Sequence, residues 1–162
     1  MPSIRELNGV LNRIGNFNPT QFEQDFDNRL ILQKTIYLLQ AFGLNVGYSF
    51  NWYLRGPYSP DLSRTTYLVA SNYDPEASAQ FCDEKSEKRF CEFLAFIGTK
   101  KNDQVWLETV ASIHFLANLY GEKNEAEVYA RVSRKMGQLS RQRFVEAWNY
   151  LCRTGLLSTT IS

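Results

Sequence analysis

The sequence of 162 residues contains few of the side chains from which metal sites and disulfide frameworks are built. Histidine occurs once, as His114, so one chain cannot form a zinc site with two histidines. The three cysteines, Cys82, Cys91 and Cys152, are odd in number and include no Cys-x-x-Cys pair. That usage is typical of reduced thiols packed as small apolar groups. We therefore expect no metal or other cofactor and no disulfide scaffold.

The sequence also lacks an excess of charge of one sign and any long apolar run. The 18 Lys and Arg residues against 17 Asp and Glu residues give a net charge of +1, so the whole chain has no strong electrostatic pull toward nucleic acid or an anionic membrane. Apolar runs such as Ile36–Leu39 are far shorter than the roughly 20 residues that span a bilayer. Residues 1–7 lack the apolar core of a signal peptide. We expect a cytoplasmic protein that does not enter the membrane.

The short motifs of common enzyme classes are missing as well. The sequence contains no Gly-x-Ser-x-Gly elbow, no Gly-x-x-x-x-Gly-Lys phosphate loop and no His-Glu-x-x-His pair. His114 stands between Ile113 and Phe115 on an apolar helical face, which favours a satisfied, partly buried histidine over a general base. The acids of residues 83–87 alternate with basic residues, as on a solvated helix face. We expect a protein that is not an enzyme.

The composition that is present fits one globular domain. Apolar residues make up 44% and charged residues 22% of the chain, which excludes wholesale disorder. A chain of this length buries roughly two-thirds of the surface that its unfolded form exposes. Because no repeat or low-complexity tract divides the sequence, we expect a single domain over residues 1–162.

Apolar residues recur with helical spacing along most of the chain, which predicts a mostly α, compact multi-helix domain with a small β element. Ser3 and Glu6 form a capping box for the first helix. The expected helices run from Ser3, from Asn18 as a short piece, from Asp27 or Asn28 to Phe42, over residues 60–71 and 83–97, from Asn102 or Asp103 to Tyr120, and over residues 124–136 and 140–154.

Residues 48–54 alternate apolar and polar side chains, which predicts a strand that ends at Gly56-Pro57. This alternation places Phe50, Trp52 and Leu54 toward the core. Residues 156–161 form a second candidate strand that would pair with it. Beside the two last helices, that strand would give a degenerate winged-helix-like C-terminal part.

Four side chains around the Gly-Pro turn are the candidate protein-binding residues: Tyr53, Arg55, Tyr58 and Ser59. The alternation leaves tyrosines and an arginine free to contact a partner, and these residue types dominate binding energy in protein interfaces. A purely structural interpretation, in which the turn only redirects the chain between strand and helix, stays open.

Residues 131–153 carry a local excess of positive charge, with Glu146 as the single acid. Two helices with glycine between them resemble a helix–turn–helix, which could neutralise phosphates and present side chains to a DNA groove. The alternative is an ordinary basic face of a helical bundle. The candidate nucleic-acid-binding residues are Arg131, Arg134, Lys135, Arg141, Arg143 and Arg153.

Two stretches, Arg29–Gly43 and Tyr48–Leu62, resemble the YwgA-like group of uncharacterised prokaryotic proteins. More distantly, they are similar to the Panacea (SocA-like) antitoxin domain. The shared pattern is Leu32-Gln33-Lys34 on a helix, an aromatic segment, and a Tyr-x-x-Gly-Pro turn at residues 53–57. The resemblance covers a family-like core at residues 29–69, and implies a compact helical domain that contacts proteins, such as toxins, rather than catalysing a reaction.

Gln33 and Lys34 lie on the narrow polar side of their predicted helix, from which they could hydrogen-bond the carbonyls of the Gly56-Pro57 turn. Such bonds would hold the tyrosines around the turn in a fixed display for binding. Alternatively, they merely satisfy backbone groups that the fold buries.

The sequence thus favours a cytoplasmic, non-enzymatic protein-interaction module, antitoxin-like or an accessory regulator. Its partner would be a protein, a toxin among the candidates, and the sequence leaves room for a homo-oligomer. A DNA-binding regulator that uses the two C-terminal helices is the alternative. Enzymatic use of His114 is the least favoured hypothesis.

Overall fold

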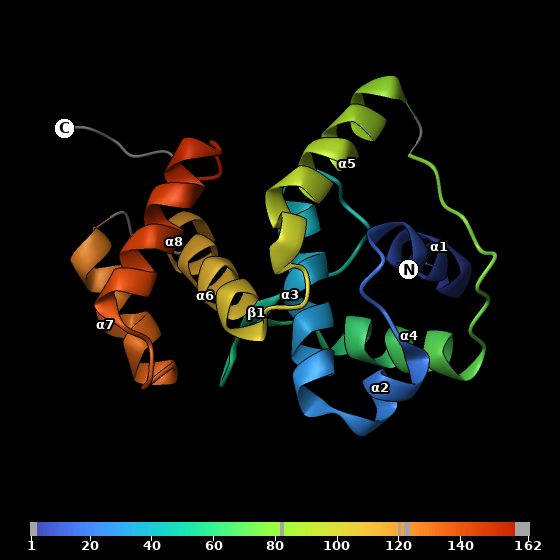
Figure 1. Ribbon diagram of the computed structural model, residues 1–162, viewed down its shortest axis with the longest axis horizontal. Helices are drawn as coiled ribbons and strands as arrows, with labels where there is room; N and C mark the ends of the chain where they lie inside the picture. The colour runs from blue at the N-terminus through green and yellow to red at the C-terminus, as the bar shows by residue number, and fades with distance from the viewer. Residues whose placement is uncertain (1–2, 82, 120, 122–123, 158–162) are drawn as a thin grey trace.

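The computed structural model describes residues 3–81, 83–119, 121 and 124–157 (Figure 1). The predicted mostly α fold with a small β element is confirmed. In chain order the elements are α1 (Ile4–Ile14), α2 (Pro19–Gln24), α3 (Phe26–Ala41), β1 (Asn51–Tyr53), β2 (Gly56–Tyr58), α4 (Pro60–Ser71), α5 (Glu84–Ile97), the 3₁₀ turn η1 (Gly98–Lys100), α6 (Gln104–His114), the π-helical turn η2 (Phe115–Leu119), α7 (Glu125–Lys135) and α8 (Arg141–Arg153).

Side-chain caps fix where the helices begin. In each case a short polar side chain accepts a backbone N–H of the first turn, which would otherwise lack a partner. Asp25, rather than Asp27 or Asn28, caps α3, because its carboxylate accepts both the Asp27 N–H and the Asn28 amide. The capping residues are Ser3, Asn18, Asp25, Ser59, Asp83, Asp103, Asn124 and Ser140.

Helices α3 and α6 pack against each other at the centre of the molecule (Figure 1). Helices α1, α2 and α4 form one flank beside α3, while α7 and α8 pack on α6 at the opposite end. Both central helices are buried over most of their surface, from Leu30 to Leu39 in α3 and from Leu107 to His114 in α6. The apolar core is therefore continuous from one flank to the other.

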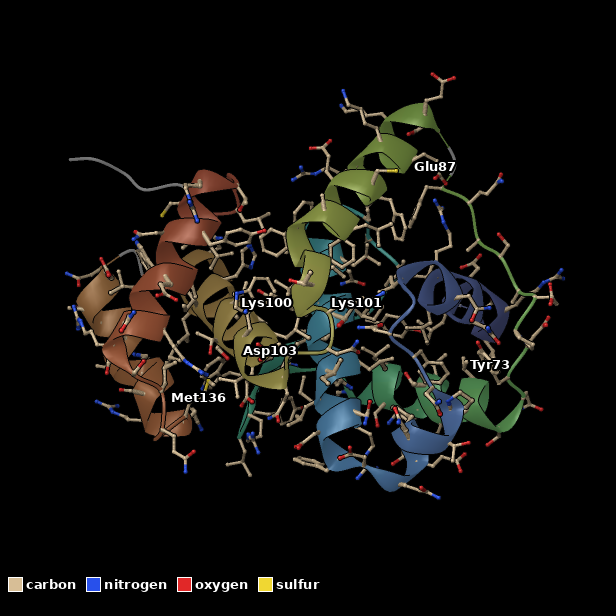
Figure 2. All side chains as sticks on the ribbon, viewed as in Figure 1. Tyr73, Glu87, Lys100, Lys101, Asp103 and Met136 are labelled. Carbon is tan, nitrogen blue, oxygen red and sulfur yellow. The ribbon has the colours of Figure 1, made fainter. Side chains whose placement is uncertain are left out.

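Helix α5 and the segment before it are tied to α1 by polar side chains. Arg13 of α1 forms a two-point ion pair with Glu87, at 2.9 and 2.8 Å. Figure 2 labels Glu87 on α5. Residues 72–81, which form no helix or strand, are held where Asn8 exchanges two hydrogen bonds with the backbone of Asp74. Side chains of α1 thereby satisfy backbone groups that this irregular segment cannot satisfy itself.

The β element differs from the predicted one. Strand β1 pairs with β2 in an antiparallel hairpin, with Asn51 opposite Tyr58 and Tyr53 opposite Gly56. Gly56 and Pro57, at which the predicted strand was expected to end, are therefore the first residues of β2. Leu54 lies in the turn and is 79% exposed, so its predicted place in the core was wrong. Alternation assigns faces only while the strand continues, and the chain reverses at Leu54.

The predicted winged-helix-like C-terminal part is not present in the described residues. Leu156 and Leu157 lie in a buried turn whose two N–H groups both donate to the Leu151 carbonyl, so they do not begin a strand. Residues 158–161 of the expected strand lie outside the described residues. The observed hairpin instead packs on α3 and α6.

Candidate functional site

The Gly-Pro hairpin is fastened to α3 by two buried polar side chains. The Lys34 ammonium group donates to the Pro57 carbonyl at 2.7 Å. The Gln33 amide donates to the Ser59 carbonyl and accepts the Ser59 N–H, both at 2.9 Å. The predicted bond from Lys34 to the turn is thus present, whereas Gln33 bonds the backbone of Ser59, beyond the Gly56-Pro57 pair. Both side chains are buried rather than on a polar side, because the hairpin covers that face of the helix.

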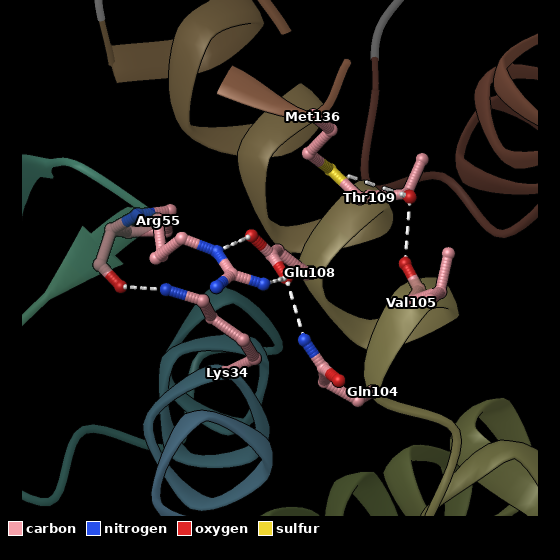
Figure 3. Close-up of polar contacts among 8 residues, drawn as sticks. Lys34, Arg55, Gln104, Val105, Glu108, Thr109 and Met136 are labelled. Atoms are coloured by element: carbon pink, nitrogen blue, oxygen red, sulfur yellow. Dashed lines mark hydrogen bonds and ion pairs between the residues drawn. The ribbon is translucent and has the colours of Figure 1, made fainter. Parts of the chain in front are cut away.

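An ion pair fastens the same hairpin to α6. The Arg55 guanidinium meets the buried Glu108 carboxylate at two points, Nε to Oε1 at 2.9 Å and Nη2 to Oε2 at 3.1 Å (Figure 3). Gln104 donates a further hydrogen bond to Glu108. Two-point guanidinium–carboxylate pairs are geometrically specific, so Arg55 is held in place. Arg55 is therefore paired within the molecule, although 41% of its side chain is exposed, and its contact with a partner stays a prediction.

Gly56 lies where no larger residue fits. Its φ is +93°, which side chains with a Cβ rarely adopt. A Cβ added there would come within 2.5 Å of the Ser112 hydroxyl of α6 and 3.5 Å of the Lys34 amine. The hairpin backbone therefore approaches both central helices closely, and glycine is required for that approach.

Charge is concentrated beneath the hairpin. Burial lowers the pKa of Lys34 to about 8, and the nearby Glu108 carboxylate partly opposes that shift. The hydrogen bond to Glu108 raises the pKa of Arg55. The buried Glu108 carboxylate thus interacts with two cations: Arg55, which belongs to the turn, and Lys34, which bonds the turn from α3. Removing any of the three would leave charge unbalanced in the interior.

Above this base, the hairpin and its neighbours present large apolar side chains to solvent. Phe26 is 51% exposed, Tyr53 43% and Tyr67 41%, beside the still more exposed Leu54. The half-buried Tyr58 ring meets the Tyr53 ring edge-on at 5.3 Å. Phe26, Tyr53, Leu54, Tyr58 and Tyr67 together are called the hairpin surface below.

A small cavity of about 120 Å³ opens within the hairpin surface. Phe22, Phe26, Tyr58 and Tyr67 are among the residues that line it. The cavity joins the hairpin to α2, α3 and α4, since these side chains come from all of them. The cavity therefore joins Phe26, Tyr58 and Tyr67 of the hairpin surface, and Tyr53 adjoins them through its contact with the Tyr58 ring.

The structure changes the membership of the predicted binding set. Tyr53 and Tyr58 lie on the hairpin surface as predicted, but Ser59 is buried, because its hydroxyl caps α4 and its backbone is bonded to Gln33. Sequence reasoning missed Phe26 and Tyr67. Tyr67 carried a signal, because it lies off the face on which Leu62 and the other buried residues of α4 recur.

The predicted nucleic-acid-binding residues are all exposed, on or beside α7 and α8, but they do not share one face. Arg141 stacks on the Tyr129 ring of α7 at 4.7 Å. Arg143 and Arg153 instead line a cleft between α8 and the end of α5. Tyr150 of α8, which lines the same cleft, is half-buried, and its hydroxyl donates to the Phe96 carbonyl at 2.6 Å.

His114 is the satisfied histidine that the sequence predicted. Its Nδ1 lies 2.7 Å from the Tyr37 hydroxyl, and burial lowers its pKa to about 4, so the ring is neutral at physiological pH. Across the described part of the chain, no three His, Cys, Asp or Glu side chains are close enough to share a metal ion.

The two cysteines that the structure describes differ from the expected buried thiols. Cys91 is exposed and Cys152 is half-buried, with burial raising its pKa. Cys91 lies on the solvent side of α5, opposite the face that Phe90 and Phe93 bury, so its helix position decides its exposure. Cys82 lies outside the described residues.

Comparison of the chain with protein-family models, with curated proteins and with solved structures gives no match. Among the described residues, no helix has both the length and the apolar character that crossing a membrane requires.

Proposed function

We propose that the protein is a non-enzymatic interaction module that binds a protein partner through the hairpin surface. The observation that carries this proposal is a cluster of exposed apolar side chains around a cavity, on a turn fixed from below by buried hydrogen bonds. Contiguous apolar patches on soluble proteins mark interaction sites. A turn that is already ordered loses little conformational freedom on binding.

Charge around the hairpin surface indicates the chemistry of the partner. Glu23, Asp25 and Asp27 are exposed beside Phe26, whereas Arg55 is neutralised by Glu108 and Arg64 pairs with Asp61. Arg29, the one cation among the described residues that line the cavity, donates to the backbone carbonyls of Phe22 and Glu23, so the three exposed acids still outnumber it. The cavity accepts one apolar side chain. The partner is therefore a protein segment that inserts an apolar anchor and carries Lys or Arg on either side of it.

The resemblance of residues 29–69 supports an antitoxin-like or accessory regulatory role in the cytoplasm, with a toxin as the protein partner. Under that role, the anchor segment would belong to the toxin. A homo-oligomer through the same surface is the competing arrangement, and the experiment below separates the two.

The test is selection from a random peptide display library against the wild-type protein, with counter-selection against a Tyr53→Ala/Leu54→Ser variant. We expect enriched peptides with one bulky apolar residue flanked by basic residues. Truncation of an interface hot spot costs about 2 kcal/mol of binding free energy. Tyr53→Ala and Leu54→Ser, each made alone, should therefore weaken binding of the selected peptides roughly thirtyfold. Isothermal titration calorimetry measures the loss.

Ile4→Ala is the matched control, because Ile4 is a similarly exposed apolar residue on α1, outside the hairpin surface. It should leave peptide affinity unchanged. Peptides that bind the wild type and the double variant equally would contradict the proposal. Concentration-dependent dimerisation that the double variant abolishes would show that a second copy, and not another protein, occupies the surface.

The second candidate is a DNA-binding regulator that uses α7 and α8. The exposure of all six predicted basic residues favours it. Under this alternative, reversing Arg131, Arg134 and Arg143 to Glu removes phosphate contacts, lowers affinity for all DNA sequences and flattens the salt dependence. Electrophoretic shifts with genomic fragments distinguish it, because the hairpin variants would then bind DNA normally.

A further inference from the structure

A second recess is lined by residues of α6 other than Glu108 and Ser112, which contact the hairpin. It is a cleft of about 610 Å³ between the end of α5, η1, the start of α6 and one side of α8. Figure 2 shows Lys100 and Asp103 where η1 leads into α6, at the edge of this cleft. Its volume lies within the range of ligand sites in proteins. The proposed protein-binding function does not use it.

The cleft has an aromatic wall. The Trp106 ring lies 5.7 Å from both the Phe96 and the Tyr150 rings, and those two are 4.9 Å apart. Trp106 and Tyr150 are only half-buried, so each keeps surface toward the cleft. The hydrogen bond from the Tyr150 hydroxyl to the Phe96 carbonyl joins α8 to α5 and holds this wall in shape.

Five charged side chains line the cleft, three basic and two acidic. Both acids have partners within the molecule, whereas two of the basic side chains have no carboxylate partner in the part of the chain that the structure describes. The Lys100 amine and the Asp103 carboxylate approach each other at 3.8 Å, and Asp103 also caps α6. Glu146 accepts a hydrogen bond from Gln142. Arg143 and Arg153 are exposed, and neither guanidinium meets a carboxylate of the described residues. The Arg153 guanidinium lies over the Tyr150 ring, 5.7 Å from its centroid, so cation and ring adjoin at this end of the cleft.

The spacing of the two arginines restricts the ligand. They are ten positions apart on α8, which corresponds to about 15 Å along a helix axis. That separation favours a ligand with more than one anionic group over a single small anion. A ligand with several phosphates can contact both arginines, and the aromatic wall between them suits planar rings. Aromatic side chains flanked by a basic groove are the arrangement that binds single-stranded nucleic acid, with bases stacked and the backbone tracked by cations.

We propose that the cleft between α5 and α8 binds a single-stranded nucleic acid segment, with bases against Trp106 and Tyr150 and phosphates at Arg143 and Arg153. An acidic peptide would use the arginines but not the ring surfaces. A duplex keeps its bases stacked inside, so the recessed rings could not reach their faces. Both are therefore outcomes of the test and not the proposed ligand.

The test is fluorescence anisotropy with short labelled oligothymidylate and oligouridylate, which distinguish DNA from RNA. We expect saturable binding of at least one of the two oligonucleotides. The logarithm of the binding constant should fall with the logarithm of the salt concentration with a slope near −1.4, about −0.7 for each of two phosphate contacts. Arg143→Gln and Arg153→Gln should each weaken binding about tenfold and reduce the slope. Trp106→Leu should weaken binding with the slope unchanged, once circular dichroism shows that the variant is folded.

Arg141→Gln is the matched control. It removes the same charge from α8, but Arg141 stacks on Tyr129 and does not line the cleft, so affinity should stay within about twofold. An equal loss for Arg141→Gln would overturn the proposal, since general charge would then explain binding. Tighter binding of a duplex of equal length, equal competition by polyglutamate, or no binding of either strand at low salt would also overturn it.

Discussion

At the residue scale, burial acts on two ionisable groups in the centre of the fold. It lowers the pKa of Lys34 and the pKa of His114, one beneath the hairpin and one on α6. Lys34 keeps the Pro57 carbonyl as partner, and His114 keeps the Tyr37 hydroxyl. For both, folding favours the neutral form, so the stability of the protein depends on pH.

His114 gives the clearer pH prediction. Its pKa is about 4 in the folded protein against 6.5 in the unfolded chain, so between these values only the unfolded state binds the proton. Stability therefore falls as the pH drops from 6.5 to 4, by about 3 kcal/mol from this group. Tyr37, whose pKa burial raises, does not titrate in that window.

His114→Gln keeps a polar group near Tyr37 but cannot titrate, so we expect it to remove that part of the loss. Urea unfolding of both proteins at pH 7, 6, 5 and 4 gives the difference between their free energies of unfolding at each pH. The contribution of the carboxylates cancels in this difference, because both proteins contain the same ones. Parallel stability–pH curves for the two proteins would show that His114 is not held neutral.

At the element scale, the hairpin depends on its close approach to α6. Gly56 combines a positive φ with direct contact, whereas Gly43 has the same φ of +93° and no atom within 4 Å of an added Cβ. The pair therefore separates backbone strain from overpacking. Strain of this kind costs roughly 1 to 2 kcal/mol, and overpacking adds about 1 to 3 kcal/mol.

We predict that Gly43→Ala lowers the free energy of unfolding by about 1 kcal/mol and Gly56→Ala by about 3 kcal/mol. Ser112→Ala combined with Gly56→Ala should recover part of the larger loss, because it removes the hydroxyl that a Cβ would meet. Chemical denaturation of the single and double variants measures this coupling. Equal losses at both glycines, without coupling to Ser112, would contradict the close approach.

At the scale of the whole molecule, α3 and α6 connect the two flanks through one buried core. Leu38 of α3 and Val110 of α6 are both fully buried. A contiguous core predicts that the flanks unfold together, as expected for a single domain.

We predict one unfolding transition, with the same midpoint by tryptophan fluorescence and by far-ultraviolet circular dichroism. The tryptophans lie in β1, α6 and α8, whereas circular dichroism also reports on α1 to α5. Leu38→Ala should lower the free energy of unfolding by about 2 to 5 kcal/mol. The midpoints measured by fluorescence and by circular dichroism should therefore shift together. Two separate midpoints would show instead that the α1–α4 flank folds independently of α6–α8.

Much of the helical framework was predictable from sequence, because its signals are local. A cap such as Ser140 and the N–H that it satisfies lie three residues apart, and the bounds of α4, α5, α7 and α8 followed from such neighbours. Periodicity is a local signal of the same kind: Val128 and Val132 recur four positions apart and are both buried, while the basic residues of α7 are exposed.

The tertiary structure alone decided which polar side chains are buried and which apolar ones are exposed. The polar side of their helix indicated hydrogen bonds from Lys34 and Gln33 to the turn, but it did not indicate that a hairpin more than 20 residues later would bury both side chains. The same hairpin pairs Arg55 with a carboxylate 53 positions away and leaves Leu54 in solvent. Likewise, Arg143 lines a cleft because the end of α5 lies across from α8. These outcomes depend on contacts between distant elements, and local patterns carry no information about them.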